Sequence, residues 1–569
     1  MKTAKLCWGQ RYMWLRFHQL PPAHRHETHV VLRLGVHEGI TLANCRATLT
    51  YLARRHEALR TTFHLDGDGD PYQKVDPPGP VRAVEVTTER DGTPSPAEVV
   101  EDLSSRPFDL ETEWPIRACV ITSGGVPKQM VVVLNHLAVD VWTIGELKRE
   151  LRMQRAGFAS RRPAAIQPVR HQPADLARYE SSAEAAVTAA RAVAHWENEI
   201  AQLPYDLFAT RRARPDGPPA RHATLISHAL LAASRELAAA HQAWPSLIHL
   251  TAYTATMAAY TGSETVGHLS FVGNRDSHPY GDVLTCMFSP TLVRVDCSGD
   301  PTFGELLTRV AAAFARAREH AYLPYDEVVE LLSREGSRRA HPVRLASEFN
   351  FIKQASREYK GARTAYTTNP VPEAWARTGT DTYVRVDEWK DAVAISLHAA
   401  ASVMDGEAVE RFLRGFESVL LAARDDAFRL SDATALAAFP PAGAPTPSNA
   451  SGHAGASGHA SASGRGGASG HAAARPYTEI SDADPAAEQD LAEIVRQVNG
   501  LRKTDLTRSY TLAGGRALRI PRVLAELGTQ GWTGLDVCQL AGPTPLRALA
   551  RRLVPLSTQD RNRLGVVTS

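Results

Sequence analysis

The stretch Val131–Trp142, VVVLNHLAVDVW, decides how the chain is interpreted. Its unbroken apolar run predicts a buried strand. The strand ends on Asn135 and His136, and Asp140 follows about one helical turn further on. A histidine at a strand end is usually a satisfied polar group, so the HxxxD spacing alone does not define a site. The rest of the chain has to decide.

Length and composition set the first limits. At 569 residues the chain is long enough for two or three folding units. Hydrophobic residues make up 43% and charged residues 22%, which is typical of a soluble globular protein. The net charge of +2 argues against a nucleic-acid partner. No apolar run reaches membrane-spanning length, and the N-terminus lacks the apolar region of a signal peptide.

The cysteines indicate a reducing compartment. Six are present, and none has a partner at a spacing typical of a disulfide framework or a metal site. We expect reduced thiols in a cytoplasmic protein that does not act at a membrane. These are Cys7, Cys45, Cys119, Cys286, Cys297 and Cys538.

A change in composition divides the chain. Residues 440–476 are rich in Gly, Ala, Ser and His and almost free of large apolar side chains, which predicts a flexible linker. Ser-Gly-His recurs at His453, His459 and His471, so a metal site is the alternative interpretation. A tether is favoured because Gly and Ser do not preorganise the three rings, and no metal is expected. Roughly 35 such residues have an r.m.s. span of about 30–35 Å.

The segments on either side of the linker differ in class. Residues 1–439 show a mixed α/β pattern, with a helix predicted over Thr41–Arg60 and strands over His29–Val36 and Ala392–Ala399. Residues 477–556 predict a small all-helical unit, whose first helix stops at Gly500. Residues 557–569 form a tail.

Further motifs accompany the HxxxD stretch in a fixed order. Phe271–Asp276 reads FVGNRD, and the other motifs are LCWGQRYMWL (Leu6–Leu15), RRHEALRTTF (Arg54–Phe63), SRPFDLETEWPIRA (Ser105–Ala118), MFSPTLVRVD (Met287–Asp296), YLPYDEVVELL (Tyr322–Leu332) and SRRAHPVRLASEFNF (Ser337–Phe351). Together they resemble the motifs of the condensation domains of nonribosomal peptide synthetases. The resemblance implies an α/β fold over residues 1–439, in which two chloramphenicol acetyltransferase-like halves form a V around a central tunnel. It also implies amide-bond formation between a carrier-bound acyl thioester and an amine.

The chemistry of His136 suits that reaction. An imidazole titrates near 6.5 and an α-amino group near 7.7–8, so at neutral pH His136 is mostly an uncharged proton acceptor. It could take the amine proton or orient the amine during attack on the thioester. General-base assistance is worth about 10²–10⁴-fold, while positioning of both reactants is worth roughly 7–11 kcal/mol. We therefore expect positioning in the tunnel to account for most of the rate enhancement, with His136 as the catalytic group.

The neighbours of His136 are assigned structural roles. The resemblance implies that Asp140 pairs with Arg275 and braces the loop. The family pattern is His-His-x-x-x-Asp-Gly, whereas this chain has Asn135 for the first histidine and Val141 for the glycine. Asn135 can keep a hydrogen bond. Val141 is the more serious departure, because glycine permits backbone conformations that a β-branched residue resists. Ser289 also replaces an asparagine of the fifth motif.

The C-terminal unit is similar to a peptidyl carrier protein, a small four-helix bundle. Such a domain needs a serine at the start of its long helix to accept 4'-phosphopantetheine, and helix starts favour anions. Here Gly514, Gly515 and Arg516 lead to Ala517, which has no hydroxyl. Two explanations stay open, an engineered replacement of serine and a naturally degenerate carrier. As written, Ala517 cannot carry the cofactor, and a phosphopantetheinyl transferase is a partner only if the native residue is serine.

The sequence thus predicts a condensation–carrier didomain. It would take its donor from an upstream carrier protein in trans and depend on a separate adenylation enzyme, because no adenylation motif is present. One alternative is an acyltransferase of the same superfamily that uses free acyl-CoA or a soluble amine or alcohol. A second alternative is a catalytically silent condensation-like domain that recruits partner enzymes.

Overall fold

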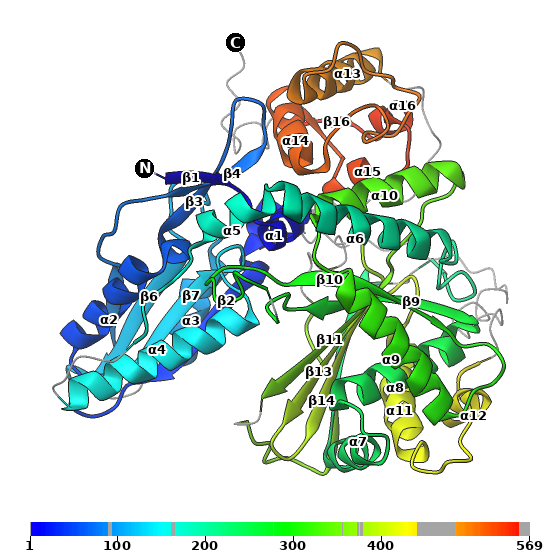
Figure 1. Ribbon diagram of the computed structural model, residues 1–569, viewed down its shortest axis with the longest axis horizontal. Helices are drawn as coiled ribbons and strands as arrows, with labels where there is room; N and C mark the ends of the chain where they lie inside the picture. Colours follow the sequence, from blue (N-terminus) through cyan, green and yellow to red (C-terminus); the bar gives the residue numbers. More distant parts are fainter. Residues whose placement is uncertain are drawn as a thin grey trace, which may run out of the picture.

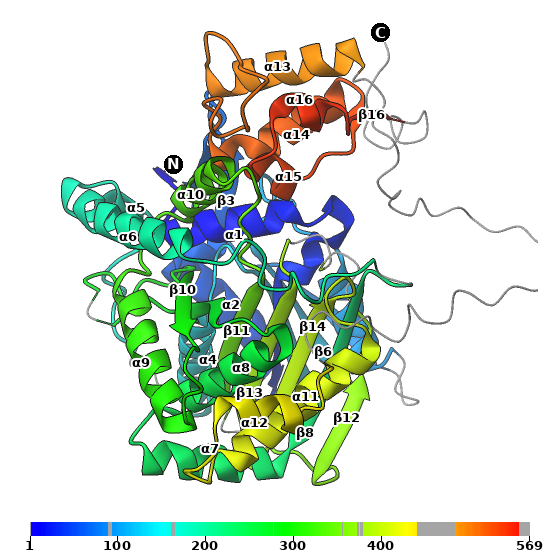
Figure 2. The same cartoon turned by 90° about the vertical axis from the view of Figure 1, so that its right-hand side faces the viewer.

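A computed structural model describes residues 2–88, 94–160, 166–214, 217–276, 278–354, 357–371, 375, 379–440 and 484–556. Up to Pro440 the chain forms two α/β halves, each built on its own sheet, which diverge like the arms of a V (Figure 1). The C-terminal helices sit above the junction of the arms (Figures 1 and 2). No helix in these described ranges is long and apolar enough to cross a membrane.

The first half is a four-stranded sheet with helices on both faces. The strand order is β2 (His29–Gly35), β7 (Val126–Asn135), β6 (Ile116–Ser123) and β5 (Ala83–Thr88). Two helices, α2 (Leu42–Arg55) and α4 (Val141–Ser160), pack together beside this sheet, and α3 (Pro96–Ser105) contacts β6 and β7. Within β7, Val132 and Leu134 join the core shared with α2 and α4, whereas Val131 packs with α3. Cover on both faces explains the apolar run, and the predicted buried strand is confirmed.

The helix predicted over Thr41–Arg60 is too long. Helix α2 ends at Arg55, and a separate 3-10 turn, η2, covers Glu57–Arg60. The break lies at His56, whose Nε2 is 2.9 Å from a carboxylate oxygen of Glu150 on α4. Arg55 also donates to Glu150, at 3.0 Å. Contacts to the neighbouring helix therefore set the end of α2, and spacing along the sequence does not reveal them.

The second half is a larger sheet of seven strands. In spatial order these are β10 (Ser289–Asp296), β9 (Thr265–Val272), β11 (Ser347–Gln354), β13 (Thr382–Trp389), β14 (Val393–Ala400), β8 (Ala220–Ser227) and β12 (Thr364–Thr368). The strands predicted over His29–Val36 and Ala392–Ala399 are confirmed as β2 and β14. The main core of this half is closed by α7 (His228–Ala240), α8 (Pro245–Thr261), α9 (Phe303–Glu319) and α11 (Gly406–Ala422).

The two halves are joined through helices and one crossing segment. Helix α1 (Trp8–Gln19) lies at the junction, beside α10 (Tyr325–Arg338). The segment that leads from β9 to β10 crosses to the first half, where Leu284 enters its core. Close packing is required here, since a Cβ at Gly9 would lie 2.4 Å from the carbonyl oxygen of Cys286. The remaining junction elements are β1 (Lys2–Lys5), β3 (Thr61–Leu65), β4 (Pro71–Val75), η1 (Pro22–Thr28), α5 (Pro173–Glu180) and α6 (Ala183–Ala201).

The C-terminal unit is mostly helical and has its own core. It contains α13 (Pro485–Asn499), η5 (Ala517–Arg519), α14 (Ile520–Thr529), α15 (Val537–Ala541) and α16 (Leu546–Ala550). Gly500 ends α13 with φ +64°, as predicted from its position. The all-helical expectation needs one correction, since Trp532–Thr533 pairs with Val554–Pro555 as a short two-stranded sheet.

The domain expectations fall partly outside the described residues. Helix α12 (Leu430–Leu436) is the last helix before Pro440, and description resumes at Asp484. The predicted linker beyond Pro440 and the predicted tail 557–569 lie outside the described ranges. All six cysteines are described and are free thiols, five of them buried.

Candidate active site between the two halves

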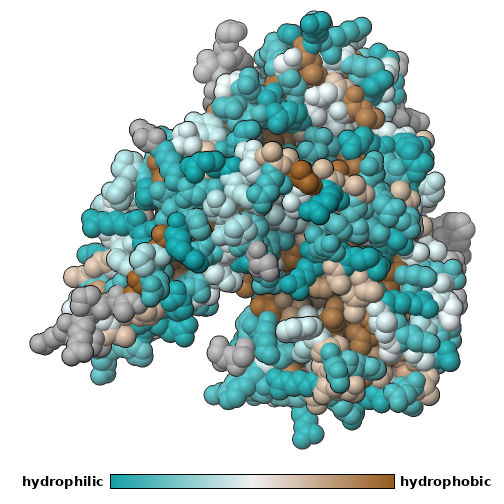
Figure 3. Space-filling view, in the orientation of Figure 1, coloured by the Kyte–Doolittle hydropathy of each residue, from teal (hydrophilic) through white to brown (hydrophobic). Residues whose placement is uncertain are grey.

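A cavity of about 520 Å³ lies between the halves. The space-filling view shows the arms parting in a notch on the side away from the C-terminal unit (Figure 3). Residues from α1, from the end of β7, from the start of α4 and from strands of the second half line the cavity. They include Tyr12, Met13, Arg16, His136, Val141, Trp142, Phe271, Phe288, Glu348, Asn350 and Tyr383.

His136 stands at the wall of this cavity, directly after β7. Its ring lies 5.2 Å from the ring of Phe288, measured between centroids. Nδ1 is buried and has no side-chain partner in the described part of the chain. Burial lowers the pKa of His136 below its ordinary value, against the opposing effects of backbone carbonyls and of Asp140. The imidazole is therefore uncharged at neutral pH and able to accept a proton.

Asp140 is committed to structure. Its Oδ2 accepts from Nη2 of Arg275 at 2.7 Å and from the backbone N–H of Met287 at 3.0 Å. Its Oδ1 accepts from the backbone N–H of Thr143 at 2.9 Å, which caps the start of α4. The carboxylate is buried and both oxygens are engaged. Asp140 therefore joins the α4 start to the crossing segment.

Arg275 completes the same network. Its Nη1 donates to the carbonyls of Gly281 and Val283, at 2.9 and 2.7 Å, and its Nη2 donates to the carbonyl of Thr285 at 2.8 Å. The guanidinium carbon also lies 4.1 Å from the ring centroid of Trp142. The structure thus brings Asp140 and Arg275 together, and the pair holds the crossing segment against the turn that carries His136.

The two departures from the family pattern have different consequences. Asn135 is fully buried, and its Oδ1 accepts from the N–H of Leu137 at 2.9 Å, so it shapes the turn without facing the cavity. Val141 does not need the backbone freedom of glycine. It is the first residue of α4, with helical backbone, and it is 61% exposed in the cavity wall. Its effect is on the shape of the cavity.

Another part of the cavity wall carries a charge pair that sequence reasoning missed, in which Glu348 is buried and Arg16 is partly buried. Nη2 of Arg16, on α1, lies 3.5 Å from Oε2 of Glu348, on β11. Glu348 also accepts from the hydroxyl of Thr380 at 2.8 Å, and nearby the amide of Asn350 donates to the hydroxyl of Tyr383 at 3.1 Å. The available signal was Glu348 itself, a carboxylate on a predicted motif segment, but the strand SEFNFIKQ holds several other polar residues that do not stand out from it. The cavity therefore has a polar part of its wall as well as the aromatic surface near His136.

Ala517 does not fit the cofactor that the C-terminal resemblance implies. It has no oxygen to esterify, its side chain is 1% exposed, and it lies at the start of η5. Ser509 and Thr511 do not replace it, since Ser509 lies 3.1 Å and Thr511 2.7 Å from the hydroxyl of Ser333 on α10. Position 517 of this chain therefore offers no hydroxyl to which a phosphopantetheine could be attached. No group of three or more metal-ligating side chains occurs in the ranges that the structure describes.

The fold and the site define a two-half α/β protein with a single imidazole at a shared cavity. The condensation domain family matches residues 2–433, and the chain belongs to this family. Among curated relatives, chondramide synthase of Chondromyces crocatus is 24% identical over 400 residues, which cover 68% of this chain and 10% of the synthase. Phosphinothricin tripeptide synthetase of Streptomyces viridochromogenes is 26% identical over 336 residues, covering 57% of this chain and 30% of the synthetase. The chain thus spans a minor part of both.

Solved structures support the fold. The condensation domain of the Monacolin K polyketide synthase MokA matches with a TM-score of 0.59 and 19% identity, over 76% of this chain and 99% of that chain. The X-domain from teicoplanin biosynthesis matches with a TM-score of 0.58 and 22% identity, over 76% and 97%. The expected α/β fold of the condensation type is therefore confirmed, and the C-terminal unit lies beyond the residues matched by the family.

Proposed function

We propose that this chain catalyses amide-bond formation between an acyl thioester and an amine. The observation that carries the proposal is the position of His136, an uncharged imidazole at the wall of a cavity lined by both halves. The two reactants are proposed to meet in this cavity, beside the imidazole. Positioning of this kind supplies the larger part of the rate, and the imidazole supplies proton transfer.

The reaction balances with one residue in a chemical role. The amine nitrogen attacks the thioester carbonyl, the C–N bond forms and the C–S bond breaks. The proton lost by the amine passes to His136, and the imidazolium then gives a proton to the departing thiolate. Asp140 and Arg275 act only by holding the turn on which His136 stands. The aromatic surface of Phe288 excludes water beside the imidazole.

The donor is proposed to arrive on a carrier protein in trans, after a separate adenylation enzyme has activated it. The test is a mass-spectrometric assay of amide product, in which one acyl group is supplied either on a carrier protein or on CoA, with a panel of amines. Faster product from the carrier-bound donor supports this proposal. Equal or faster product from acyl-CoA supports the stand-alone acyltransferase, and hydrolysis without any amide would reject amide synthesis.

The C-terminal unit is proposed to be carrier-like, which the helical core around α13 and the position of Ala517 before α14 support. Intact-mass spectrometry of the Ala517→Ser protein, after incubation with CoA and a broad-specificity phosphopantetheinyl transferase, tests this. One phosphopantetheine adduct on the serine form and none on the alanine form is expected. No adduct on either form would leave a unit that is carrier-like in shape only.

A recruiting role is the second candidate. It is favoured by the replacements Asn135 and Val141 and by the likeness to the teicoplanin X-domain, which has been solved in complex with OxyB. A recruiting domain does not need His136. Product formation that survives loss of His136 but not deletion of residues 1–439 would favour this role.

A further inference from the structure

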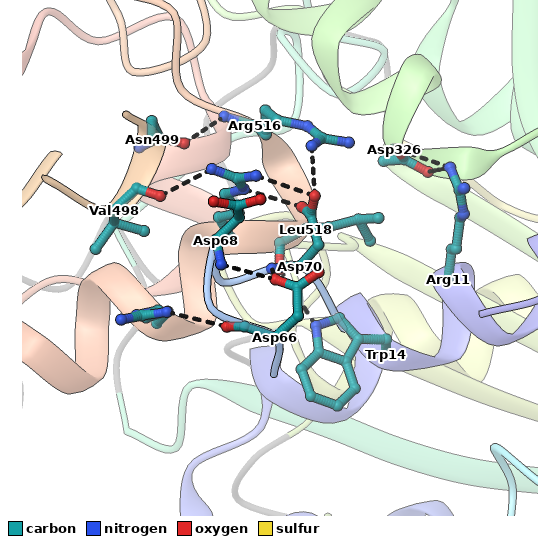
Figure 4. Close-up of polar contacts among 12 residues, drawn as sticks. Arg11, Trp14, Asp66, Asp68, Asp70, Asp326, Val498, Asn499, Arg516 and Leu518 are labelled. Atoms are coloured by element: carbon teal, nitrogen blue, oxygen red, sulfur yellow. Dashed lines mark hydrogen bonds and ion pairs between the residues drawn. The ribbon is translucent and has the colours of Figure 1, made fainter. Parts of the chain in front are cut away.

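An acidic turn of the first half holds the C-terminal unit (Figure 4). The turn between β3 and β4 reads Asp66-Gly-Asp-Gly-Asp70. Asp70 accepts from Nη1 of Arg516 at 2.6 Å and from Nε and Nη2 of Arg519 at 2.9 and 3.0 Å. Arg519 is buried, and its Nη1 also donates to the carbonyl of Val498 in its own unit. The carboxylate of Asp70 therefore pairs with both arginines near position 517.

Neutral contacts extend the same interface. The indole N–H of Trp14, on α1, donates to the carbonyl of Leu518 at 3.4 Å, and the Leu518 side chain joins the core around α1. On α10, the hydroxyl of Ser333 meets Ser509 and Thr511. The turn η5 thus lies against both α1 and α10, the helices at the junction of the two halves.

The turn at position 517 lies near a carboxyl side chain of the condensation domain. Glu330, on α10, lies beside the turn η5, and the backbone N–H of Ala517 favours its charged form. Burial and the neighbouring carboxylates of Glu327 and Asp326 raise the pKa of Glu330 to about 7, in spite of the nearby Arg334. Several carboxyl groups therefore lie close together along α10, and a further anion at position 517 would meet repulsion from those that are charged.

We propose that Asp70 and Glu330 form a docking surface for the unmodified C-terminal unit, and that an anion at position 517 is incompatible with this docked arrangement. The arginines that could neutralise such an anion are already engaged by Asp70, and the carboxyl group of Glu330 lies near the turn that would receive it. Ala517 is then the residue that suits permanent docking. The unit acts as a fixed wall beside α1, whose opposite residues line the cavity.

The consequence for carrier chemistry rests on the proposed function. With the unit docked, a loaded carrier in trans cannot use this face, so the amine must reach the cavity by another route or as a free molecule. The docking does not depend on whether the unit was ever a carrier, so the docking proposal and the carrier proposal can be rejected independently. Absence of the phosphopantetheine adduct on the Ala517→Ser protein would reject the carrier interpretation alone.

The test compares Ala517→Asp with Ala517→Asn in the full chain, because the two side chains have the same shape and differ in charge. Hydrogen–deuterium exchange of the amides at 516–520 measures the ratio of docked to undocked molecules. We expect Ala517→Asp to lower this ratio at least about tenfold relative to Ala517→Asn, from the repulsion of close charges. Protection of α13 should stay unchanged in both, which shows that the unit is still folded.

Two further variants assign the effect to the named carboxylates. In a Glu330→Gln background, the side chain keeps its shape without its charge, and the difference between the Asp and Asn forms should shrink to less than about threefold. Asp70→Asn should lower the docked ratio about fivefold to tenfold and weaken its salt dependence. The matched control is Asp68→Asn in the same turn, whose carboxylate forms none of these ion pairs, with an expected change under about twofold.

Equal exchange at 516–520 for Ala517→Asp and Ala517→Asn would overturn the proposal, as would a difference that persists unchanged without the charge of Glu330. An equal effect of Asp68→Asn and Asp70→Asn would also overturn it, because the docking would then depend on general charge and not on the arginine contacts.

Discussion

Removal of the Asp140 carboxylate tests the structural role assigned to it. The Asp140→Ala variant loses the buried ion pair to Arg275 and two hydrogen bonds from backbone N–H groups, one of which caps α4. Breaking a buried pair by deleting one partner costs about 3–5 kcal/mol, and loss of a helix cap costs about 1 kcal/mol. Arg275 keeps three carbonyl acceptors, which limits the cost of its unpaired charge. We therefore expect a loss of about 3–5 kcal/mol in total.

Urea unfolding followed by tryptophan emission measures this loss, since Trp142 lies against the guanidinium of Arg275. Asp140→Asn should cost about half as much, because its side-chain oxygen can still accept from the N–H that caps α4. The matched control is Asp282→Ala in the same crossing segment. Asp282 contacts the exposed Arg170 and the partly exposed His171, each at 3.0 Å, and each such surface pair is worth at most about 1 kcal/mol.

The opposite pattern of effects would refute the structural role of Asp140. If Asp140→Ala unfolds within about 1 kcal/mol of the unaltered protein and yet forms no amide product, Asp140 belongs to the chemistry. Equal destabilisation by Asp140→Ala and Asp282→Ala would likewise remove the special role of the buried network.

Three other substitutions have outcomes that the described contacts predict. Gly9→Ala should destabilise the junction by about 1–3 kcal/mol in a thermal unfolding assay, since its Cβ would meet a backbone oxygen at 2.4 Å; an unchanged Tm would show that the two segments can separate freely. Burial raises the pKa of Glu180 to about 8, so the stability from its protonated form is full below about 4.3 and is lost as pH rises through 8. Glu180→Gln should flatten this dependence of the unfolding free energy on pH, measured by urea titrations at several pH values. An unaltered dependence on pH would contradict this prediction. Val141→Gly should raise the rate with bulkier substrates relative to small ones while costing about 0.5–1 kcal/mol of stability, and an unchanged substrate profile would show that this side chain does not shape the cavity.

The fold and the position of the imidazole could be predicted from the sequence. The apolar run before His136 predicts a buried strand, and the ordered motifs indicate the family. The pairing of Asp140 with Arg275 came from family resemblance, because no local pattern links residues 135 positions apart. Val141 departs from the family's glycine, but its backbone is helical, so the conformational freedom of glycine is not needed at that residue.

Other features depend on contacts that a sequence does not display. Arg16 and Glu348 lie on elements far apart in the chain, and Asp70 and Arg519 are 449 residues apart. The absence of a hydroxyl at Ala517 is visible in the sequence, whereas the carboxyl group of Glu330 near it is not. Each of these pairs forms only when separate units pack together, so their partners could not be assigned from spacing or composition.

His136 is proposed to act in amide formation at the cavity shared by the two halves. The most direct test of this role is the rate of amide formation by His136→Ala, measured by mass spectrometry with one thioester donor and one amine, beside its urea unfolding curve. We expect a rate about 10²–10⁴-fold lower, with stability within about 1 kcal/mol of the unaltered protein. Product formation at the full rate in a folded His136→Ala protein would contradict the proposed role.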